Sequence, residues 1–292
     1  MISGAFTLLI TPFDKKMNLD EEGLRVLVRR QIKSGIHGLA PLGVTGESPL
    51  LNDQEIKKVV EIVVEEAAGK CKVAPDTCSN NLDQTITRVK LFEEMGCDYA
   101  VVFAPFLVKP TPAGIIDFYE RVAGSSNIPV IIHNAPARVG INIDPQTYAR
   151  LAKIDNIKGT KDGNKQMDHL AKILYLTKES SFSVFTGKDT TAYPLLSFGG
   201  SGVFTVSGNI VPEVMRDLVN HCLQGDLHQA QKIHYLYYDL FEALRFETNP
   251  MAVKEALSFM GLPGGGVRPP LTRLSLKNRE PLKKIMEERS LI

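Results

Sequence analysis

The sequence has no tryptophan, few cysteines and no long apolar run. Its four cysteines, Cys71, Cys78, Cys97 and Cys222, lack both the C-x-x-C spacing of zinc sites and the density of disulfide-rich secreted domains. We therefore expect reduced thiols and a cytoplasmic protein. No segment approaches the roughly 18 apolar residues that span a membrane, and the first residues lack the pattern of a signal peptide.

An excess of charge of one sign is also lacking. The 34 Lys and Arg residues against 33 Asp and Glu residues leave a formal charge of +1 at pH 7. No net field attracts such a chain to nucleic acid or to an anionic membrane, so we expect a small-molecule partner. The 292 residues, 43% of them hydrophobic, suffice for one large domain with a substantial core.

Short β-rich apolar runs alternate with segments of helical periodicity along most of the chain. This alternation is typical of βα units around a parallel sheet, and eight such runs predict a closed (β/α)8 TIM barrel. The predicted strands are 6–10, 38–42, 72–75, 99–104, 129–133, 157–161, 182–186 and 202–206. The predicted helices between them are 21–34, 53–68, 82–95, 111–124, 145–153, 165–178 and 190–198.

An open, doubly wound sheet is the competing topology. It normally carries G-x-G-x-x-G after its first strand, where this chain has Thr11-Pro12-Phe13-Asp14. After Val211 no strand pattern recurs, and helices are predicted over 212–224, 227–246 and 251–260. We therefore predict a barrel over residues 1–210 and a C-terminal helical region over 211–292 that packs on it.

Lys161 closes the sixth predicted strand, where catalytic residues of such barrels are found. Side chains alternate along a strand, so Ile157, Gly159 and Lys161 share one face, which we assign to the cramped barrel interior. Burial disfavours the ammonium form of lysine and lowers its pKa. The free amine could attack a carbonyl carbon and form a Schiff base, whereas the alternative is an exposed lysine at the rim.

The same alternation places His133 on the inner face of the fifth strand, next to Lys161. Histidine titrates near neutrality and could move protons to and from a carbinolamine during C–C bond cleavage. We therefore predict that Lys161 and His133 are catalytic. A hydrogen-bonded core histidine is the alternative.

Two further segments are candidates for binding anions. Gly43-Val44-Thr45-Gly46 combines glycines, a hydroxyl and amide hydrogens that could hold a carboxylate, although a simple tight turn would look the same. Arg138 follows His133 closely and could clamp a second carboxylate, although an isolated loop arginine is usually a solvated charge.

Four motifs jointly resemble the dihydrodipicolinate synthase and N-acetylneuraminate lyase superfamily of class I, Schiff-base aldolases. They are G-V-T-G-E-S at 43–48, N-x-P-x-R-x-G from Asn134 to Gly140, G-T-K-D at 159–162 and G-G-x-G-V at 199–203. Thr11-Pro12-Phe13 near the start and Asn249-Pro250 in the tail extend the resemblance over essentially the whole chain.

The resemblance implies a TIM barrel in which Lys161 condenses with pyruvate or another 2-oxo acid while Thr45 and neighbouring amides hold the carboxylate. It implies a cytoplasmic homotetramer, built as a dimer of dimers, with no metal and no cofactor beyond the imine on Lys161. The predicted function is a lyase or aldolase that joins or separates pyruvate and an aldehyde, acting on a 2-keto-3-deoxy acid or a related 2-oxo acid. The substrate-binding positions that it implies are Gly43, Val44, Thr45, Arg138, Gly187 and Phe204.

Three positions depart from the family pattern. His133 stands where the family has a catalytic tyrosine, Val44 where synthases have threonine, and Leu107 where synthases have a tyrosine that reaches across a subunit interface. The three-hydroxyl proton relay of the synthases is therefore absent. The ordinary pKa values of tyrosine and histidine differ by roughly 3.5, so a histidine mechanism would have a different pH profile.

The motifs indicate two different classes of substrate. Arg138 matches the synthase arginine that binds the carboxylate of the aldehyde substrate, which favours an acidic partner. Asp162 instead resembles the 2-keto-3-deoxy-sugar-acid and hydroxy-oxoglutarate aldolase branch, since synthases usually have glutamate there. Dihydrodipicolinate synthase, acting on pyruvate and aspartate semialdehyde, and a pyruvate-binding pseudoenzyme stay open as alternatives.

Two other chemistries are alternatives to a Schiff base. The histidines are scattered and no H-E-x-x-H occurs, so a metal-dependent aldolase is not expected. A phosphate cradle made by Gly187-Lys188 and Ser207-Gly208-Asn209, after the last two strands, would need no Schiff base.

Overall fold

Eight parallel strands form the inner wall of the molecule, which confirms the predicted sheet. The computed structural model describes all 292 residues. The hydrogen-bonded order is β3-β2-β1-β8-β7-β6-β5-β4, so β1 pairs with β8, and β3 and β4 stand at the two ends of the order. The strands are β1 (Gly4–Leu8), β2 (Gly38–Ala40), β3 (Lys72–Val73), β4 (Ala100–Phe103), β5 (Val130–Asn134), β6 (Ile157–Asp162), β7 (Ser183–Thr186) and β8 (Gly202–Thr205).

Asp76 joins the two ends of this order. It forms parallel bridges with Leu42, just beyond β2, and with Val101 of β4. The Val101 amide donates to the Pro75 carbonyl, and the Thr77 amide donates to the Val101 carbonyl, each at 2.9 Å. These contacts close the sheet into the predicted barrel and place a carboxylate in its wall.

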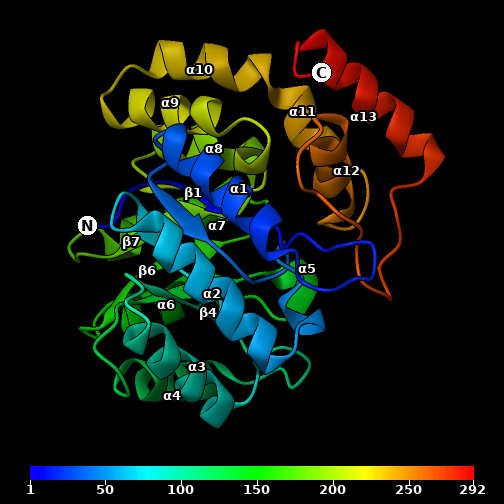
Figure 1. Cartoon of the computed structure of the whole chain (residues 1–292). Coiled ribbons are helices and arrows are strands. Elements are labelled where there is room, and N and C mark those ends of the chain that lie inside the picture. The colour runs from blue at the N-terminus through cyan, green and yellow to red at the C-terminus, as the bar shows by residue number, and fades with distance from the viewer.

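Helices surround the barrel, as Figure 1 shows. Many begin at a residue whose side chain accepts a hydrogen bond from the amide three positions later, namely Asp20, Asn52, Asn81, Thr111 and Asp144. The helices up to the last strand are α1 (Glu21–Lys33), α2 (Asp53–Ala67), α3 (Leu82–Glu94), α4 (Pro112–Ala123), α5 (Pro136–Val139), α6 (Pro145–Leu151), α7 (Met167–Thr177) and α8 (Ala192–Ser197), with short 3-10 turns at Ser48–Leu50, Asp189–Thr191 and, after β8, Ser207–Asn209.

Five helices follow the last strand. The single helix predicted over 227–246 is broken at Tyr237, because the second half turns to bury Leu240 and Phe241 against the barrel side and α13. The last helix was not predicted, since its sequence is strongly polar and buries only Leu282 and Met286. In Figure 1 these elements cover one side of the barrel. They are α9 (Pro212–Leu223), α10 (Leu227–Leu236), α11 (Tyr238–Ala243), α12 (Met251–Phe259) and α13 (Leu276–Glu288).

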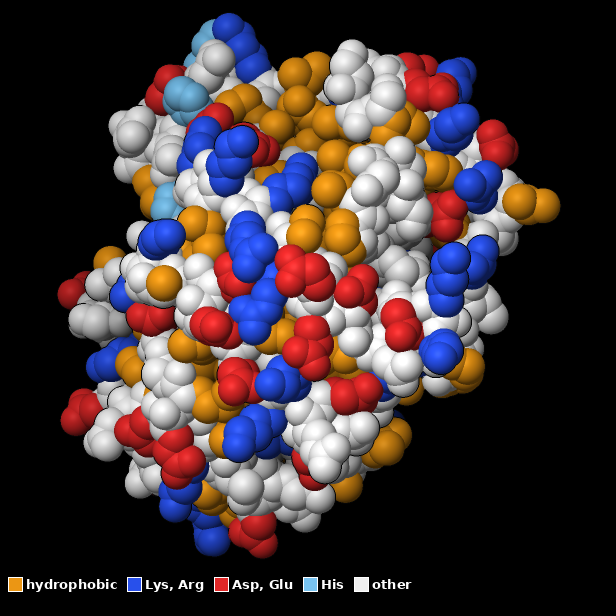
Figure 2. Space-filling view, in the orientation of Figure 1, with side chains coloured by type: hydrophobic (Ala, Val, Ile, Leu, Met, Phe, Trp, Pro, Cys, Tyr) orange, Lys and Arg blue, Asp and Glu red, His pale blue; other side chains and the backbone are white.

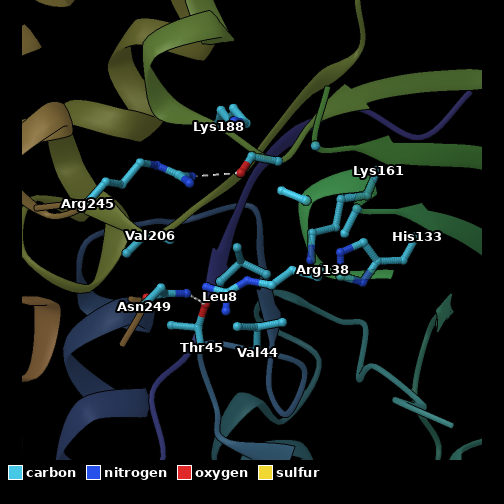
Figure 3. Close-up of a pocket in the computed structure, with 14 residues that line it drawn as sticks. Leu8, Val44, Thr45, His133, Arg138, Lys161, Lys188, Val206, Arg245 and Asn249 are labelled. Carbon is cyan, nitrogen blue, oxygen red and sulfur yellow. Dashed lines mark hydrogen bonds between the residues drawn. The ribbon is translucent and has the colours of Figure 1, made fainter. Parts of the chain in front are cut away.

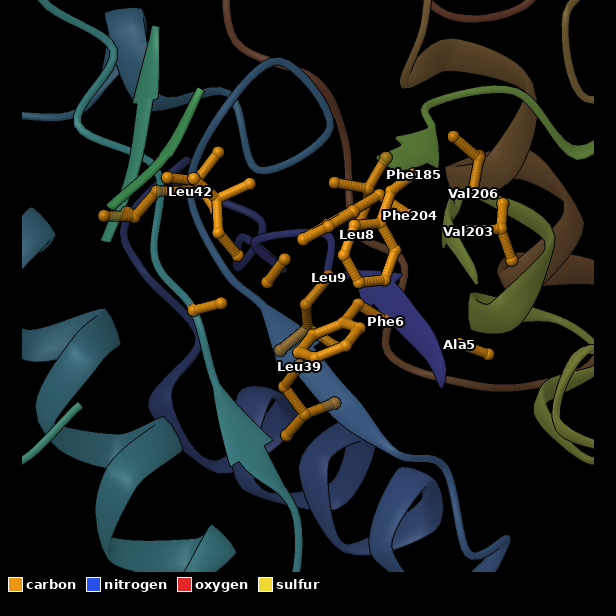
Figure 4. Packing of buried hydrophobic residues seen from close by; sticks show 14 of the residues in the cluster. Ala5, Phe6, Leu8, Leu9, Leu39, Leu42, Phe185, Val203, Phe204 and Val206 are labelled. Atoms are coloured by element: carbon orange, nitrogen blue, oxygen red, sulfur yellow. The ribbon is translucent and has the colours of Figure 1, made fainter. Parts of the chain in front are cut away.

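Aromatic rings fill the barrel interior (Figure 4). Phe6 stacks on Phe204 with ring centroids 5.0 Å apart, and Phe185 meets Phe204 edge to face at 5.2 Å. Such pairs add to the gain from burying their apolar area. One continuous core of 72 buried residues includes side chains from both the barrel and the later helices, while the division at residue 210 itself stays a prediction.

The face drawn in Figure 2 mixes acidic and basic side chains without a large patch of either sign. This distribution agrees with the near-zero net charge. None of the helices combines the length and the apolar character that a bilayer crossing requires.

Candidate active site

A cavity of about 120 Å³ opens where the strands end. Because one liquid water molecule occupies about 30 Å³, the cavity can hold a small organic acid. Figure 3 shows that its side chains come from the barrel strands, the loops after them and the C-terminal region. The lining residues are Leu8, Val44, Thr45, His133, Ala135, Ala137, Arg138, Lys161, Gly163, Gly187, Lys188, Val206, Arg245 and Asn249.

Lys161 lies on β6 and is 5% exposed, so the alternative of an exposed rim lysine is wrong. Gly187 packs beside the lysine chain, since a Cβ atom there would lie in ordinary contact with its Cε, at 3.5 Å. Its Nζ lies 5.6 Å from the centre of the Phe204 ring below it. Burial lowers the pKa of Lys161 to about 8, against the opposing charge of Asp76. About one amine in ten is then uncharged at pH 7, compared with about one in 3,000 for an ordinary lysine.

His133 pairs with Lys161 in the register of β5 and β6, which confirms their predicted adjacency. Its Nδ1 lies 2.6 Å from Oδ2 of Asp76, and both side chains are buried. The other carboxylate oxygen of Asp76 accepts from the Cys78 amide at 2.9 Å. Burial and the charge of Lys161 lower the pKa of His133, while Asp76 opposes this shift. The imidazole is therefore neutral near pH 7 and, with Nδ1–H donating to Asp76, keeps a lone pair on Nε2.

The loop after β2 presents backbone donors to the cavity. The amides of Val44 and Thr45 donate to no group of the protein, and both residues line the cavity. The Thr45 hydroxyl accepts from Nδ2 of Asn249 at 2.8 Å, which leaves its own proton available. Gly43 lies behind them with φ +63°, and a Cβ there would meet the Asp76 side chain at 3.3 Å. The loop can therefore bind a carboxylate through neutral donors.

The C-terminal region holds this loop in place. Glu47 lies 2.5 Å from Nζ of Lys254 on α12, and its second oxygen accepts from the Arg268 amide at 2.9 Å. The side chains of Glu47 and Lys254 are almost fully buried. Removing either partner would leave the other as an uncompensated buried charge.

Three more cations line the cavity. Arg138 extends from α5, Lys188 follows β7, and Arg245 lies just beyond α11. Nη2 of Arg245 donates to the Gly187 carbonyl at 3.0 Å, as the dashed line in Figure 3 marks. The lining contains no Asp or Glu residue, so the cavity favours anionic compounds.

The structure brings most of the predicted site residues together. Besides the two catalytic candidates, the lining includes Val44, Thr45, Arg138 and Gly187. Gly43 and Phe204 lie outside it, the first against Asp76 and the second below Lys161. Sequence reasoning did not single out the roles of Asp76 and Arg245, and it noted Asn249 only as a family motif.

Asp162 faces away from the cavity. Its Oδ2 accepts from Nδ2 of Asn134 at 2.9 Å and from the Tyr148 hydroxyl at 3.0 Å, and it is fully buried. The Asp162 side chain thus orders polar groups behind β6 and does not line the cavity, and the branch that it resembles stays a prediction.

The proposed phosphate cradle after β8 is not available to a ligand. The amide and hydroxyl of Ser207 both donate to Asp189, and the Gly208 amide donates to the Thr205 hydroxyl at 2.9 Å. The Asn209 side chain bonds to backbone groups. That alternative is therefore wrong for these three residues, because their donors are already used inside the protein.

The comparison with known proteins agrees with this geometry. The chain matches the model of the "Dihydrodipicolinate synthetase family" over residues 1–289. It belongs to this family. It is 37% identical over 288 residues to the 4-hydroxy-tetrahydrodipicolinate synthase of Methanospirillum hungatei, covering 98% of this chain and 99% of that protein. The crystal structure of dihydrodipicolinate synthase from Aquifex aeolicus has 35% identity, 99% coverage of both chains and a TM-score of 0.96.

Membership of the dihydrodipicolinate synthetase family makes this chain a pyruvate-dependent Schiff-base enzyme of the lyase or synthase type. Family enzymes use no cofactor beyond the imine on a lysine. Within the structure, no three His, Cys, Asp or Glu side chains are grouped as metal ligands. A synthase variant described as monomeric has a TM-score of 0.97, 34% identity and coverage of 100% of this chain and 98% of its own, so the homotetramer stays a prediction.

Proposed function

We propose that this enzyme is a class I aldolase that joins pyruvate and an aldehyde, or cleaves the resulting 2-keto-3-deoxy acid. The observation that carries the proposal is the pairing, inside one cavity, of a buried lysine of low pKa with a neutral histidine. The first supplies a nucleophilic amine at neutral pH, and the second supplies a base beside it.

The reaction begins when Nζ of Lys161 attacks C2 of pyruvate and forms a carbinolamine. Loss of water gives the imine, whose positive nitrogen acidifies the C3 hydrogens. Removal of one C3 proton gives an enamine, which attacks the aldehyde carbon while the aldehyde oxygen gains a proton. Hydrolysis by one water molecule releases the 2-keto-3-deoxy acid and restores the amine.

His133 is the residue we assign to these proton transfers. Asp76 fixes the ring through Nδ1, so Nε2 is the atom that accepts and returns the proton. The carboxylate also stabilises the imidazolium that forms transiently. The amides of Val44 and Thr45, together with the Thr45 hydroxyl, bind the pyruvate carboxylate.

Borohydride reduction in the presence of pyruvate tests the imine. We expect a pyruvyl adduct on Lys161 in the peptide mass spectrum of the wild type, and none in Lys161→Arg. Lys158→Ala is the matched control, because Lys158 lies on the same strand but outside the cavity. If no adduct forms on Lys161 of the folded wild type, the proposed function is wrong.

A panel of substrates then identifies the reaction. Release of pyruvate from 2-keto-3-deoxy acids, 4-hydroxy-2-oxoglutarate or N-acetylneuraminate would establish an aldolase. The second candidate is condensation of pyruvate with aspartate semialdehyde, which the names of the relatives and the position of Arg138 favour. An adduct without turnover of any compound would instead indicate a pyruvate-binding pseudoenzyme.

A further inference from the structure

A second cavity lies apart from the catalytic one, and we call it the glycine-loop cavity. Its volume is about 400 Å³, compared with about 120 Å³ for the active-site cavity, and the two share no lining residue. Its walls come from the loop after β1, from α12, from the loop after α12 and from α13. In Figure 1 the loop after α12, drawn in orange, passes beside the blue loop after β1. The cavity therefore has room for a small organic ligand outside the reaction site.

The loop after α12 brings free backbone donors to this cavity. The amides of Gly265, Gly266 and Val267 donate to no group of the protein, and all three residues line the cavity. Gly265 has a φ of +66°, and a Cβ atom there would come within 2.4 Å of the Phe13 carbonyl oxygen, so this position requires glycine. Successive N–H groups around a left-handed residue form a concave site for anions.

Cationic side chains outnumber acidic ones around these amides. The cations that line the cavity are Lys15, Lys254, Arg273 and Arg279, against the acidic residues Asp14 and Glu255. Both acidic residues are already engaged, since Asp14 accepts from two amides of its own loop, at 2.7 and 2.9 Å, and Glu255 lies 2.6 Å from Nε of Arg279. Lys15 and Arg273 are exposed and form no ion pair within the chain. Two unpaired cations and three free amides thus face one cavity, which favours an anionic ligand.

Lys254 connects this cavity to the catalytic loop. It is buried, its Nζ donates to the Gly266 carbonyl at 2.7 Å, and the same atom lies 2.5 Å from Oε1 of Glu47. Glu47 belongs to the loop that offers the Val44 and Thr45 amides to the active-site cavity. A ligand in the glycine-loop cavity would therefore lie beside the lysine that holds this loop, on a side that the substrate does not reach.

We propose that the glycine-loop cavity binds a phosphate monoester, held by the amides of residues 265–267 and by Lys15 and Arg273. A phosphate ester has a charge of about −1.5 to −2 at pH 7 and three acceptor oxygens, which suits two unpaired cations and three amides. A carboxylate has two acceptor oxygens and a single charge. Met17 and Leu274 line the same cavity and offer apolar contacts to the organic part of the ligand. Because the site is separate from the reaction cavity, its ligand is an effector and not a substrate.

Calorimetric titration of the whole protein with glycerol 3-phosphate tests the site and needs no turnover. The double variant Lys15→Gln with Arg273→Gln should bind it about 10-fold or more weakly than the wild type, since charge-assisted hydrogen bonds are individually strong. Both side chains are exposed, so the substitutions leave the core intact. The double variant Lys277→Gln with Arg150→Gln is the matched control, because it removes two exposed cations outside the cavity, and its affinity should equal that of the wild type.

A further variant separates this cavity from the catalytic one. Arg245→Gln removes a cation of the active-site cavity and should leave unchanged the binding that the Lys15 and Arg273 double variant loses. Loss of binding in Arg245→Gln, with full binding in that double variant, would place the phosphate in the active-site cavity and overturn the proposal. Succinate, a dicarboxylate of similar charge, should bind about 10-fold more weakly than glycerol 3-phosphate. Equal affinities for the two compounds, or no binding of glycerol 3-phosphate by the wild type, would also contradict a phosphate site.

Discussion

His133 and Asp76 form a buried pair with 2.6 Å between Nδ1 and Oδ2. Asp76 lies just beyond β3 and bridges to Val101 of β4, and β4 in turn pairs with β5, which carries His133. The pair combines a base with the group that orients it, in the position where related enzymes are expected to use a hydroxyl group.

Asp76→Asn separates orientation of the base from formation of the imine. We expect kcat to fall about 100-fold or more, because general acid–base catalysis contributes about 10²–10⁴-fold. The pyruvyl adduct should still form. Asp76 raises the pKa of Lys161, so its neutralisation should move the midpoint of imine formation to lower pH. Asp83→Asn, at an exposed helix start, is the control and should change neither quantity.

His133→Ala should likewise reduce turnover far more than adduct formation, since the base acts after the nucleophile. Steady-state kinetics and quantitative trapping on the same preparation would measure both. Equal losses in the two assays would contradict this division of labour.

The rate of imine formation should depend on the free amine of Lys161. With a pKa of about 8, the uncharged fraction of Lys161 rises about tenfold for each pH unit below that midpoint and levels off above it. His133 is already neutral from pH 7 upward, since its pKa is lowered, so it adds no second transition there. Rapid-quench trapping with pyruvate between pH 6 and 10 would measure the profile. A midpoint near 10 would show an ordinary, solvated lysine.

Thr45→Val should weaken pyruvate binding. The variant keeps the shape of the side chain but removes the hydroxyl and leaves Nδ2 of Asn249 without its acceptor. A lost hydrogen bond to a charged group costs about 1.5–3 kcal/mol, so we expect KM for pyruvate to rise about 10-fold or more. Thr248→Val, at the exposed neighbouring position, is the control. An unchanged KM would show that Thr45 does not bind the carboxylate.

Lys254→Met should destabilise the fold, because Glu47 would remain buried without its partner. The expected loss is about 3–5 kcal/mol in the free energy of unfolding, measured by urea denaturation. The double variant Glu47→Gln with Lys254→Met should recover part of it. Lys283→Met removes one partner of an exposed pair and should cost about 1 kcal/mol or less. Similar losses in the two single variants would contradict the role of burial.

The alternation of strand-like and helix-like segments was enough to predict the strands. The inward direction of Lys161 and His133 followed because side chains on a strand repeat every two residues. They could not reveal Asp76. Only Lys72 and Val73 form the regular part of its strand, and Pro75 and Thr77 flank it like loop residues. Its role depends on barrel closure, which brings residues distant in sequence together.

Arg245 was missed for a related reason. It lies in a segment predicted to continue one long helix, and the break at Tyr237 is set by packing against later parts of the chain. Nothing local distinguishes this arginine from a solvated one. Its position becomes evident only from its bond to the Gly187 carbonyl.

Arg245 donates a hydrogen bond to Gly187, and Asn249 donates one to Thr45. Through these two contacts the C-terminal region helps to determine which substrate the site accepts. The reactive amine is fixed by the strands, whereas the surroundings of the incoming aldehyde depend partly on a separate, later segment. Replacing residues around 245–249 could therefore redirect the enzyme to other aldehydes while the carbon–carbon bond chemistry stays as it is.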